Sequence, residues 1–139
     1  KFSNMPDFRG LVFFNSLSDL GATEERLQFN GASAVSLASD INIKFRKVIL
    51  EKFKNHEISL LLGTDLLARG IDIENLEVVI NFDIPRDREA YTHRAGRTGR
   101  MGNEGSVISL VTHPEDLKKL KKFAKVSELV LKNQELHEK

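Results

Sequence analysis

The chain has 139 residues, of which 40% are hydrophobic and 29% charged, and its formal net charge is +1. This balance is ordinary for one soluble globular domain, and it excludes a protein that binds nucleic acid through its overall charge. The absence of cysteine excludes disulfides and thiolate metal sites and fits a reducing, cytoplasmic environment.

Histidine spacing and hydropathy exclude two further classes. The four histidines lack the spacing of metal ligands, so we expect no metal site from His56, His93, His113 and His137. There is no signal peptide and no apolar run of about 18 residues, so we expect neither secretion nor a membrane partner. Because the chain begins with Lys1 rather than methionine, we interpret it as a piece of a longer protein.

The first half of the chain predicts strand, helix, strand, helix and strand at residues 10–14, 16–29, 33–37, 41–56 and 58–64. The first helix is expected to begin at Ser16 or Ser18, since serine caps helix N-termini. The third strand is apolar throughout, as a buried parallel strand should be. The second helix is expected to place near one face the residues Phe45, Val48, Ile49, Lys52 and Phe53.

The second half predicts strand, helix, strand and helix at residues 76–85, 87–97, 105–111 and 114–125. Pro85 is expected to end the first of these strands, and Pro114 to start the last helix. In that helix Leu117, Leu120 and Phe123 recur at helical spacing, which indicates a packed stripe with solvated lysines outside it. The remaining tail is ambiguous between an edge strand and a frayed helix.

The alternation of strands and helices predicts the α/β class, with one parallel β-sheet and helices on both faces. In such sheets, functional residues gather in the loops beyond the carboxyl ends of the strands. Polar segments follow each of the first four predicted strands, so these segments are the candidates for function.

The segment GTDLLARGIDI continues the third predicted strand into a turn. Thr64 offers a hydroxyl and a backbone N–H at a strand end, which is a common way to hold a phosphate. Asp65 and Asp72 flank Arg69 and Gly70. Structural alternatives are open for two of these residues, since Asp65 could cap the following turn and Arg69 could pair with a carboxylate.

The segment YTHRAGRTGR concentrates positive charge, with Arg94, Arg97 and Arg100 at a spacing of three and glycines at 96 and 99. Arginine presents a planar fork suited to phosphate oxygens and stays charged at physiological pH. Several arginines directed at one place require a polyphosphate or several carboxylates. A nucleotide undergoing phosphoryl transfer is the natural match.

The segments LVFFNS, TDLLARGID and YTHRAGRTGR resemble, in order and spacing, motifs IV, V and VI of the DEAD-box RNA helicases. The resemblance spans residues 10–125, and VINFDIP is similar to the strand that links the motifs. His93 favours this branch over DNA helicases and translocases. The resemblance implies that residues 1–139 form the second, C-terminal RecA-like domain of a helicase whose N-terminal domain lies outside this chain.

The resemblance also implies a nucleotide site. Arg97 and Arg100 match the motif VI arginines that reach the γ-phosphate of ATP in the cleft between two RecA-like domains. His93 matches the histidine that bridges to the first domain. Asp72, near the ribose, and Gly70 stand at the motif V positions beside the nucleotide.

A second set of residues matches positions along the RNA path of the family. Thr64 matches the motif V threonine on an RNA phosphate, and Arg46 matches an arginine on the helix after the second strand. Asn15 and Ser16 stand at the motif IV positions that border the RNA. We expect contacts with phosphates and sugars, and therefore little sequence preference.

Three charged residues are expected to hold the motifs together instead. Arg94 is expected to pair with an aspartate and to hold motif V, without touching nucleotide. Asp65 and Arg69 are the other residues assigned to this structural pairing.

The sequence departs from the family where LHGDMSQxER is common and this chain reads LASDINIKFR. Ala38 replaces a histidine, and Ile43 replaces a glutamine three residues before Arg46. These changes are expected to alter the RNA grip of that helix. The alternative is that Ile43 packs into the core.

The chain has no G-x-x-x-x-G-K-[ST] phosphate loop, no D-E-A-D and no S-A-T. We therefore expect ATP and Mg²⁺ to be bound mainly by the absent N-terminal domain, and the isolated chain to be inactive. The expected partners are RNA and that N-terminal domain, and the expected state is a monomer. The rival interpretation is a non-enzymatic module that binds RNA or a protein.

Overall fold

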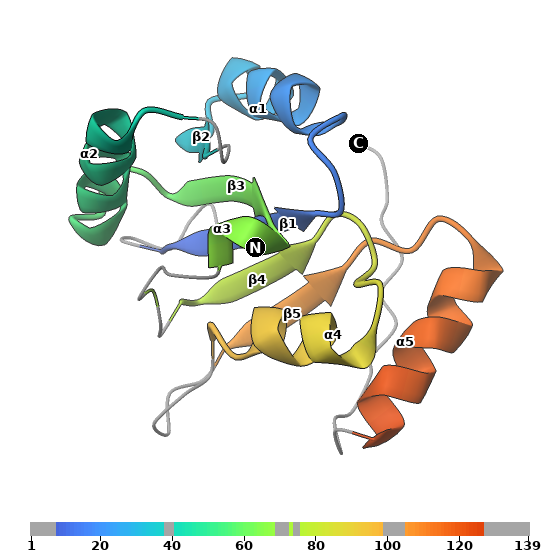
Figure 1. Ribbon diagram of the computed structural model, residues 1–139. Coiled ribbons are helices and arrows are strands. Elements are labelled where there is room, and N and C mark those ends of the chain that lie inside the picture. Colours follow the sequence, from blue (N-terminus) through green and yellow to red (C-terminus); the bar gives the residue numbers. More distant parts are fainter. Residues whose placement is uncertain (1–7, 38–40, 69–72, 74–75, 99–104, 127–139) are drawn as a thin grey trace.

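The computed structural model of the chain describes residues 8–37, 41–68, 73, 76–98 and 105–126. At its centre is a parallel five-stranded sheet in the order β2-β3-β1-β4-β5 (Figure 1). The strands are β1 (Gly10–Phe14), β2 (Ala34–Ser36), β3 (Leu60–Thr64), β4 (Val78–Asn81) and β5 (Ser106–Ser109). All five predicted strands are therefore present, each at or within its expected range.

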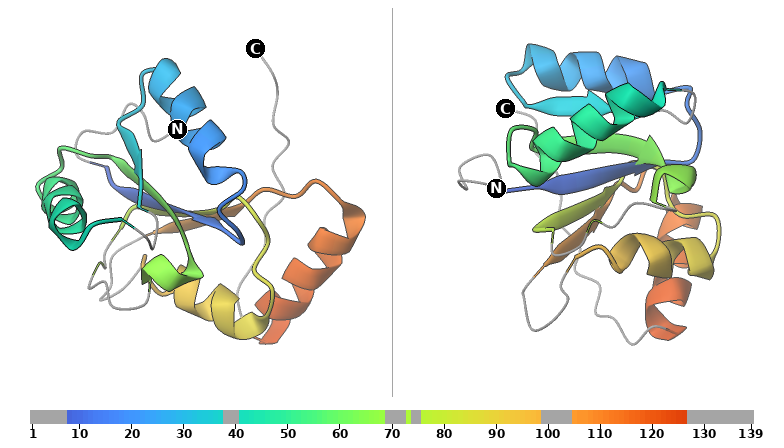
Figure 2. Two further views of the ribbon diagram at one scale, coloured as in Figure 1. Left: turned by 45° about the horizontal axis from the view of Figure 1, so that its top comes forward. Right: turned by 60° about the vertical axis from the view of Figure 1, so that its left-hand side comes forward.

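Helices cover both faces of the sheet, as the α/β pattern predicted. They are α1 (Leu20–Phe29), α2 (Ile43–Lys54), α3 (Asp65–Ala68), α4 (Arg88–Ala95) and α5 (Pro114–Val126). Figure 2 shows α1 on one side of the sheet and α3 and α4 on the other, with α5 beside α4. None of the described helices has the length and apolar character needed to cross a membrane.

The core forms two layers because successive side chains of a strand point to opposite faces. On β1, Leu11 and Phe13 belong to a cluster that includes Phe53 of α2. Val12 and the neighbouring Phe14 belong to a second cluster, which includes Leu20 of α1. A strand that is buried on both faces needs a continuous apolar run, which explains the sequence GLVFF.

The prediction that α1 begins at Ser16 or Ser18 is wrong. The helix begins at Leu20, with Asp19 at the N-cap position and no hydrogen bond from its side chain. The hydroxyls of Ser16 and Ser18 lie 2.8 Å apart and bond to each other instead. Local side-chain hydrogen bonds of this kind compete with helix capping.

The predicted apolar face of α2 is too wide. Ile49 and Phe53 pack into the core, as predicted, but Phe45 is 65% exposed and Val48 is 50% exposed. The helix covers the sheet through a narrow stripe at a spacing of four, joined by Leu50. Helical periodicity identifies neighbours on a helix, but it does not say how wide the contact with the sheet is.

Strand β4 ends at Asn81, and the prediction that Pro85 ends it is wrong. Asn81 is paired with Phe13, and β1 extends only one residue further, to Phe14. Two backbone N–H groups, of Phe82 and Asp83, then donate to the carbonyl of Phe13 at 2.9 and 3.4 Å, and the chain leaves the sheet.

The apolar stripe of α5 packs against α4, which confirms the prediction that this lysine-rich helix has one packed side. Leu120 and Phe123 form a buried cluster with Ile84 and Tyr91, and the Tyr91 and Phe123 rings lie 5.8 Å apart. Burial raises the pKa of the Tyr91 hydroxyl above its ordinary value, so the ring is neutral at physiological pH. The predicted tail beyond residue 126 lies outside the described residues.

Candidate functional site

One fully buried arginine joins the loops at the carboxyl edge of the sheet. Arg94 on α4 is 0% exposed and donates five hydrogen bonds. The acceptors are Asp65 Oδ1 (2.7 Å) and Oδ2 (2.8 Å), Asn81 Oδ1 (3.2 Å), the Asp83 carbonyl (2.8 Å) and Asn15 Oδ1 (2.8 Å). A guanidinium has five N–H donors, so all of them are satisfied.

We call these five residues the Arg94 network. It joins segments that lie far apart in the chain, with Asp65 29 residues and Asn15 79 residues from Arg94. The guanidinium also lies 5.1 Å from the centroid of the Phe13 ring. A buried charge is tolerated only when it is paired and hydrogen-bonded. The network therefore fixes the loops after β1, β3 and β4 relative to α4.

The local sequence explains why Arg94 points inward. Asp87 starts α4 by capping it, since its Oδ1 accepts the N–H of Ala90 at 2.8 Å. Residues three apart lie on the same side of a helix, and Tyr91 and Arg94 are both buried. His93, between them, is exposed.

Arg97 lies just beyond α4, on a backbone that is fixed from two sides. Its N–H donates to the Arg94 carbonyl at 3.3 Å, and its carbonyl accepts from the N–H of Leu76 at 3.1 Å. The next residue, Thr98, forms an isolated parallel bridge with Leu76, and its hydroxyl donates to the Leu76 carbonyl. The Arg97 side chain is half-buried. Arg100, the other predicted motif VI arginine, lies outside the described residues.

Two of the residues predicted to bind RNA lie at the same edge of the sheet. Thr64 is the last residue of β3 and pairs in register with Phe14 of β1. Ser16 follows β1 by two residues and is exposed, while Thr64 is half-buried. Because β1 and β3 end at the same level, the two hydroxyls lie at the carboxyl ends of adjacent strands.

Asn15 lies at this edge too, but its side chain is turned inward. The amide nitrogen donates to the Ile84 carbonyl at 3.0 Å, and the amide oxygen accepts from Arg94. Its backbone N–H donates to Asp83 Oδ2 at 2.8 Å. Both polar atoms of the amide are engaged within the domain, and the RNA contact predicted for Asn15 stays a prediction.

The start of α2 carries the other predicted RNA residue and one departure from the family pattern. Asn42 caps this helix, accepting the N–H of Lys44 at 2.8 Å, and Arg46 is half-buried one turn further on. Ile43 is 76% exposed, so the alternative that it packs into the core is wrong. Ala38, the second departure, lies outside the described residues.

The remaining predicted residues follow β3. Asp65 is the first residue of α3 and is the aspartate that pairs with Arg94. Arg69, Gly70 and Asp72 lie outside the described residues. Within the part of the chain that the structure describes, no group of three or more histidine, aspartate or glutamate side chains is placed to hold a metal ion.

Asn81 and Asp83 belong to the network, although neither was among the predicted site residues. Asn81 is fully buried at the end of β4, where it accepts from Arg94 and donates to the Ser109 hydroxyl at 3.0 Å. The signal that could have identified it is an amide that closes an apolar run, VVIN, since a buried polar group requires partners.

Comparisons with known proteins identify the family of this domain. Residues 2–102 match the helicase conserved C-terminal domain. The ATP-dependent RNA helicase DeaD of Buchnera aphidicola is 37% identical over 98 residues, which are 70% of this chain and 16% of that protein. The probable ATP-dependent RNA helicase YfmL of Bacillus subtilis is 42% identical over 125 residues, which are 90% of this chain and 33% of that protein.

A comparison with solved structures points to the same family. The solved C-terminal domain of the DEAD-box protein Dbp5 superposes with a TM-score of 0.81 at 28% identity, covering 91% of this chain and 73% of that one. The chain thus matches one domain of a DEAD-box protein, and it spans between 16% and 33% of the two curated relatives.

Proposed function

We propose that this chain, which belongs to the DEAD-box RNA helicases and forms their helicase conserved C-terminal domain, supplies arginine fingers to ATP and part of an RNA-binding edge. The ATP would be bound mainly by an N-terminal RecA-like domain of the same protein, outside this chain. Closure of the two domains around ATP and RNA would then separate a short duplex.

The observation that carries this proposal is the anchoring of Arg97. Its backbone is held by the Arg94 carbonyl and by Leu76, and α4 itself is fastened to the sheet through the Arg94 network. A cation on a fixed backbone suits transition-state stabilisation, because preorganised charge requires no rearrangement when the reaction occurs. Arg97 and Arg100 would neutralise charge that develops on the γ-phosphate oxygens.

The described residues are better suited to bind the γ-phosphate of ATP than to bind the Mg²⁺ ion that accompanies it. Arg97 offers a permanent charge, and His93 is exposed on α4 for contact with a second domain. No cluster of carboxylates suited to Mg²⁺ is found among the described residues. We therefore assign Mg²⁺ to the N-terminal domain. Hydrolysis of bound ATP supplies the free energy for the cycle of domain closure.

The RNA-binding part of the proposal rests on register. Since β1 and β3 end together, Ser16 and Thr64 offer hydroxyls from the ends of adjacent strands at one edge. Such hydroxyls bind phosphates and sugars without reading sequence. Arg46 adds a cation from α2. Asn15 would act here by supporting the loop, since its amide is bonded to Arg94 and Ile84.

The isolated chain is expected to release no phosphate from ATP above background, with or without RNA. It lacks a phosphate loop, which in such enzymes provides most of the contacts to the β- and γ-phosphates. The measurement is steady-state phosphate release by the purified chain and by the full-length protein. Turnover by the isolated chain would contradict the two-domain assignment. A full-length protein that binds RNA but never hydrolyses ATP would instead favour a non-enzymatic binding module.

Replacing Ile43 by glutamine in the full-length protein is expected to tighten binding of single-stranded RNA by about 0.5–1.5 kcal/mol. Ile43 is exposed and lies one turn before Arg46, so a polar group there could bond to RNA or orient the arginine. Titration of labelled RNA measures the change. Ile43→Leu is the matched control and should leave the affinity unchanged, whereas Arg46→Ala should weaken binding and lower the salt slope by about 0.7. Equal affinities for the glutamine and leucine variants would contradict the idea.

A further inference from the structure

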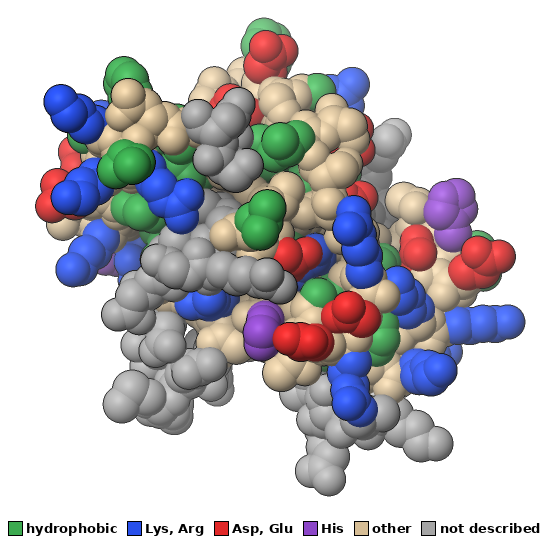
Figure 3. Space-filling view, viewed as in Figure 1, with side chains coloured by type: hydrophobic (Ala, Val, Ile, Leu, Met, Phe, Trp, Pro, Cys, Tyr) green, Lys and Arg blue, Asp and Glu red, His purple; other side chains and the backbone are tan. Residues whose placement is uncertain are grey.

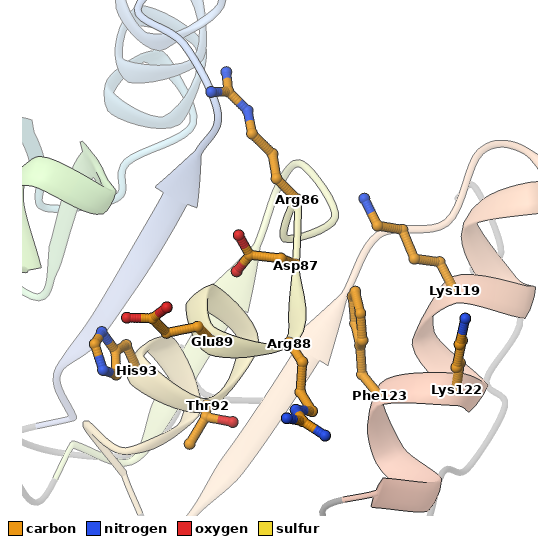
Figure 4. Close-up of a pocket in the computed structure, with 9 residues that line it drawn as sticks. All are labelled: Arg86, Asp87, Arg88, Glu89, Thr92, His93, Lys119, Lys122 and Phe123. Atoms are coloured by element: carbon orange, nitrogen blue, oxygen red, sulfur yellow. The ribbon is translucent and has the colours of Figure 1, made fainter.

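An open hollow lies between α4 and α5, and of the predicted motif VI it includes Thr92 and His93. Its volume is about 860 Å³ (Figure 4). The residues that line it are Arg86, Asp87, Arg88, Glu89, Thr92, His93, Lys119, Lys122 and Phe123. We call it the α4–α5 hollow.

The side of this hollow between the two helices is positively charged. Arg88 and Lys119 point into the gap from α4 and α5, and Lys122 lies along its α5 side (Figure 4). Asp87 and Glu89 lie on the opposite side of the first turn of α4. Asp87 and Glu89 line the hollow too, so its lining combines four cations with two carboxylates and is positive on balance.

The three cations at the gap have no carboxylate partner in the described part of the chain. Its one ion pair within 4.0 Å joins Arg94 to Asp65. Lys119 lies over the buried Phe123 ring, with Nζ 5.8 Å from the centroid. Figure 3 shows the wider setting, in which lysine and arginine side chains gather around α5 and aspartate and glutamate side chains lie over α4. Like charges held together without partners favour a polyanionic ligand.

The position of Arg86 indicates which polyanion is favoured. Arg86 lines the hollow, and its Nη2 donates to the Asn15 carbonyl at 3.0 Å. It thus joins the hollow to the loop of Asn15 and Ser16, at the edge where RNA is proposed to bind. An open hollow suits a polymer backbone better than a small ligand, which is normally enclosed on most sides.

We propose that the α4–α5 hollow is a further contact for the RNA backbone. It would receive the phosphates of a strand that continues past Ser16 and Arg86, and this proposal rests on the proposed RNA-binding function. Arg88 presents a fork to a phosphate, while Lys119 and Lys122 act as point charges. The contact depends on the charge of the RNA phosphates and not on the identity of the bases. It therefore lengthens the segment of RNA that is bound without adding a preference for particular bases.

The test compares two double variants of the full-length protein. Lys119→Ala with Lys122→Ala removes two cations from the hollow. Lys118→Ala with Lys121→Ala removes two exposed lysines from the same helix that do not line it. Affinity is measured for two single-stranded RNAs. The RNA of about 6 nucleotides is near the shortest length that one single-strand binding site covers, and the RNA of about 20 nucleotides is longer than such a site. Thermal unfolding midpoints confirm that both variants are folded.

The first double variant is expected to bind the longer RNA about tenfold more weakly, with the salt slope reduced by about 1.4, and the shorter RNA unchanged. The control should bind both RNAs normally. An equal loss in the control, or an equal loss for both RNA lengths, would overturn the proposal in favour of a general charge effect.

Two other outcomes separate this inference from the proposed function. If the hollow variant binds both RNAs like the unchanged protein, the hollow is not an RNA contact, although the RNA-binding function stands. If it loses affinity for polyglutamate but not for RNA, the hollow takes an acidic protein segment instead. If the unchanged protein binds neither RNA, the proposed function itself fails.

Discussion

Replacing Arg97 by alanine in the full-length protein is expected to slow RNA-stimulated ATP hydrolysis by about 10³-fold or more, the scale of a lost arginine finger. Arg97 is half-buried on a backbone fixed by Leu76 and by the Arg94 carbonyl, so its loss should remove a preplaced charge without moving its neighbours. The same loss is expected for Arg100→Ala. Steady-state phosphate release at saturating RNA measures both.

The affinity for ATP should change far less than the turnover, because the proposed N-terminal domain supplies most ground-state contacts. Arg97→Lys should not restore activity, since a point charge cannot reproduce the bidentate fork. Arg26→Ala is the matched control, because Arg26 is exposed on α1, across the sheet from α4. Near-normal turnover of Arg97→Ala would show that the γ-phosphate assignment is wrong.

Replacing Arg94 by alanine is expected to destabilise the domain by about 3–5 kcal/mol, the usual cost of breaking a buried pair. The change leaves the Asn81 amide and the Asp83 carbonyl without their donor in a buried setting. Asp65 retains some solvation, since its side chain is 39% exposed, so the Asn15 and Asn81 amides carry part of the cost. For a domain of this size the loss should lower the unfolding midpoint by roughly 10–20 °C.

Denaturant unfolding of the isolated chain measures this effect directly. Arg94→Lys should recover little, because an ammonium has three donors in place of a planar set of five. A cycle of Arg94→Ala, Asp65→Ala and the double variant isolates the ion pair from the amide contacts. Arg97→Ala should destabilise the domain less than Arg94→Ala, because Arg97 is half-buried and Arg94 is fully buried. A loss below about 1 kcal/mol for Arg94→Ala would contradict the structural role.

The two measurements separate arginines that stand three residues apart and look alike in the sequence. Arg94 is fully buried and completely hydrogen-bonded, so it is expected to matter for stability. Arg97 follows the helix and is half-buried, so it is expected to matter for turnover. Helix α4 ends at Ala95. Arg94 lies within the helix and faces the sheet, whereas Arg97 lies beyond the end of the helix.

Much of the fold could be predicted from local pattern. The run GLVFF predicted a buried strand, because a strand covered on both faces needs apolar residues at every position. The alternation of such runs with amphipathic segments predicted the α/β class. An aspartate partner for Arg94 was expected from the resemblance of YTHRAGRTGR to motif VI, and Asp65 is that partner.

Longer-range features depended on the tertiary structure. The sequence by itself determined that Arg94 needed acceptors, but only the fold decided that Asn15, 79 residues away, would be one of them. Periodicity placed Phe45 and Phe53 near one face of α2, but only packing decided that Phe45 stays exposed. The physical reason is the same in each case. Local pattern depends on neighbours along the chain, whereas burial and hydrogen-bond partners depend on which strands lie side by side and how far a helix overlaps the sheet.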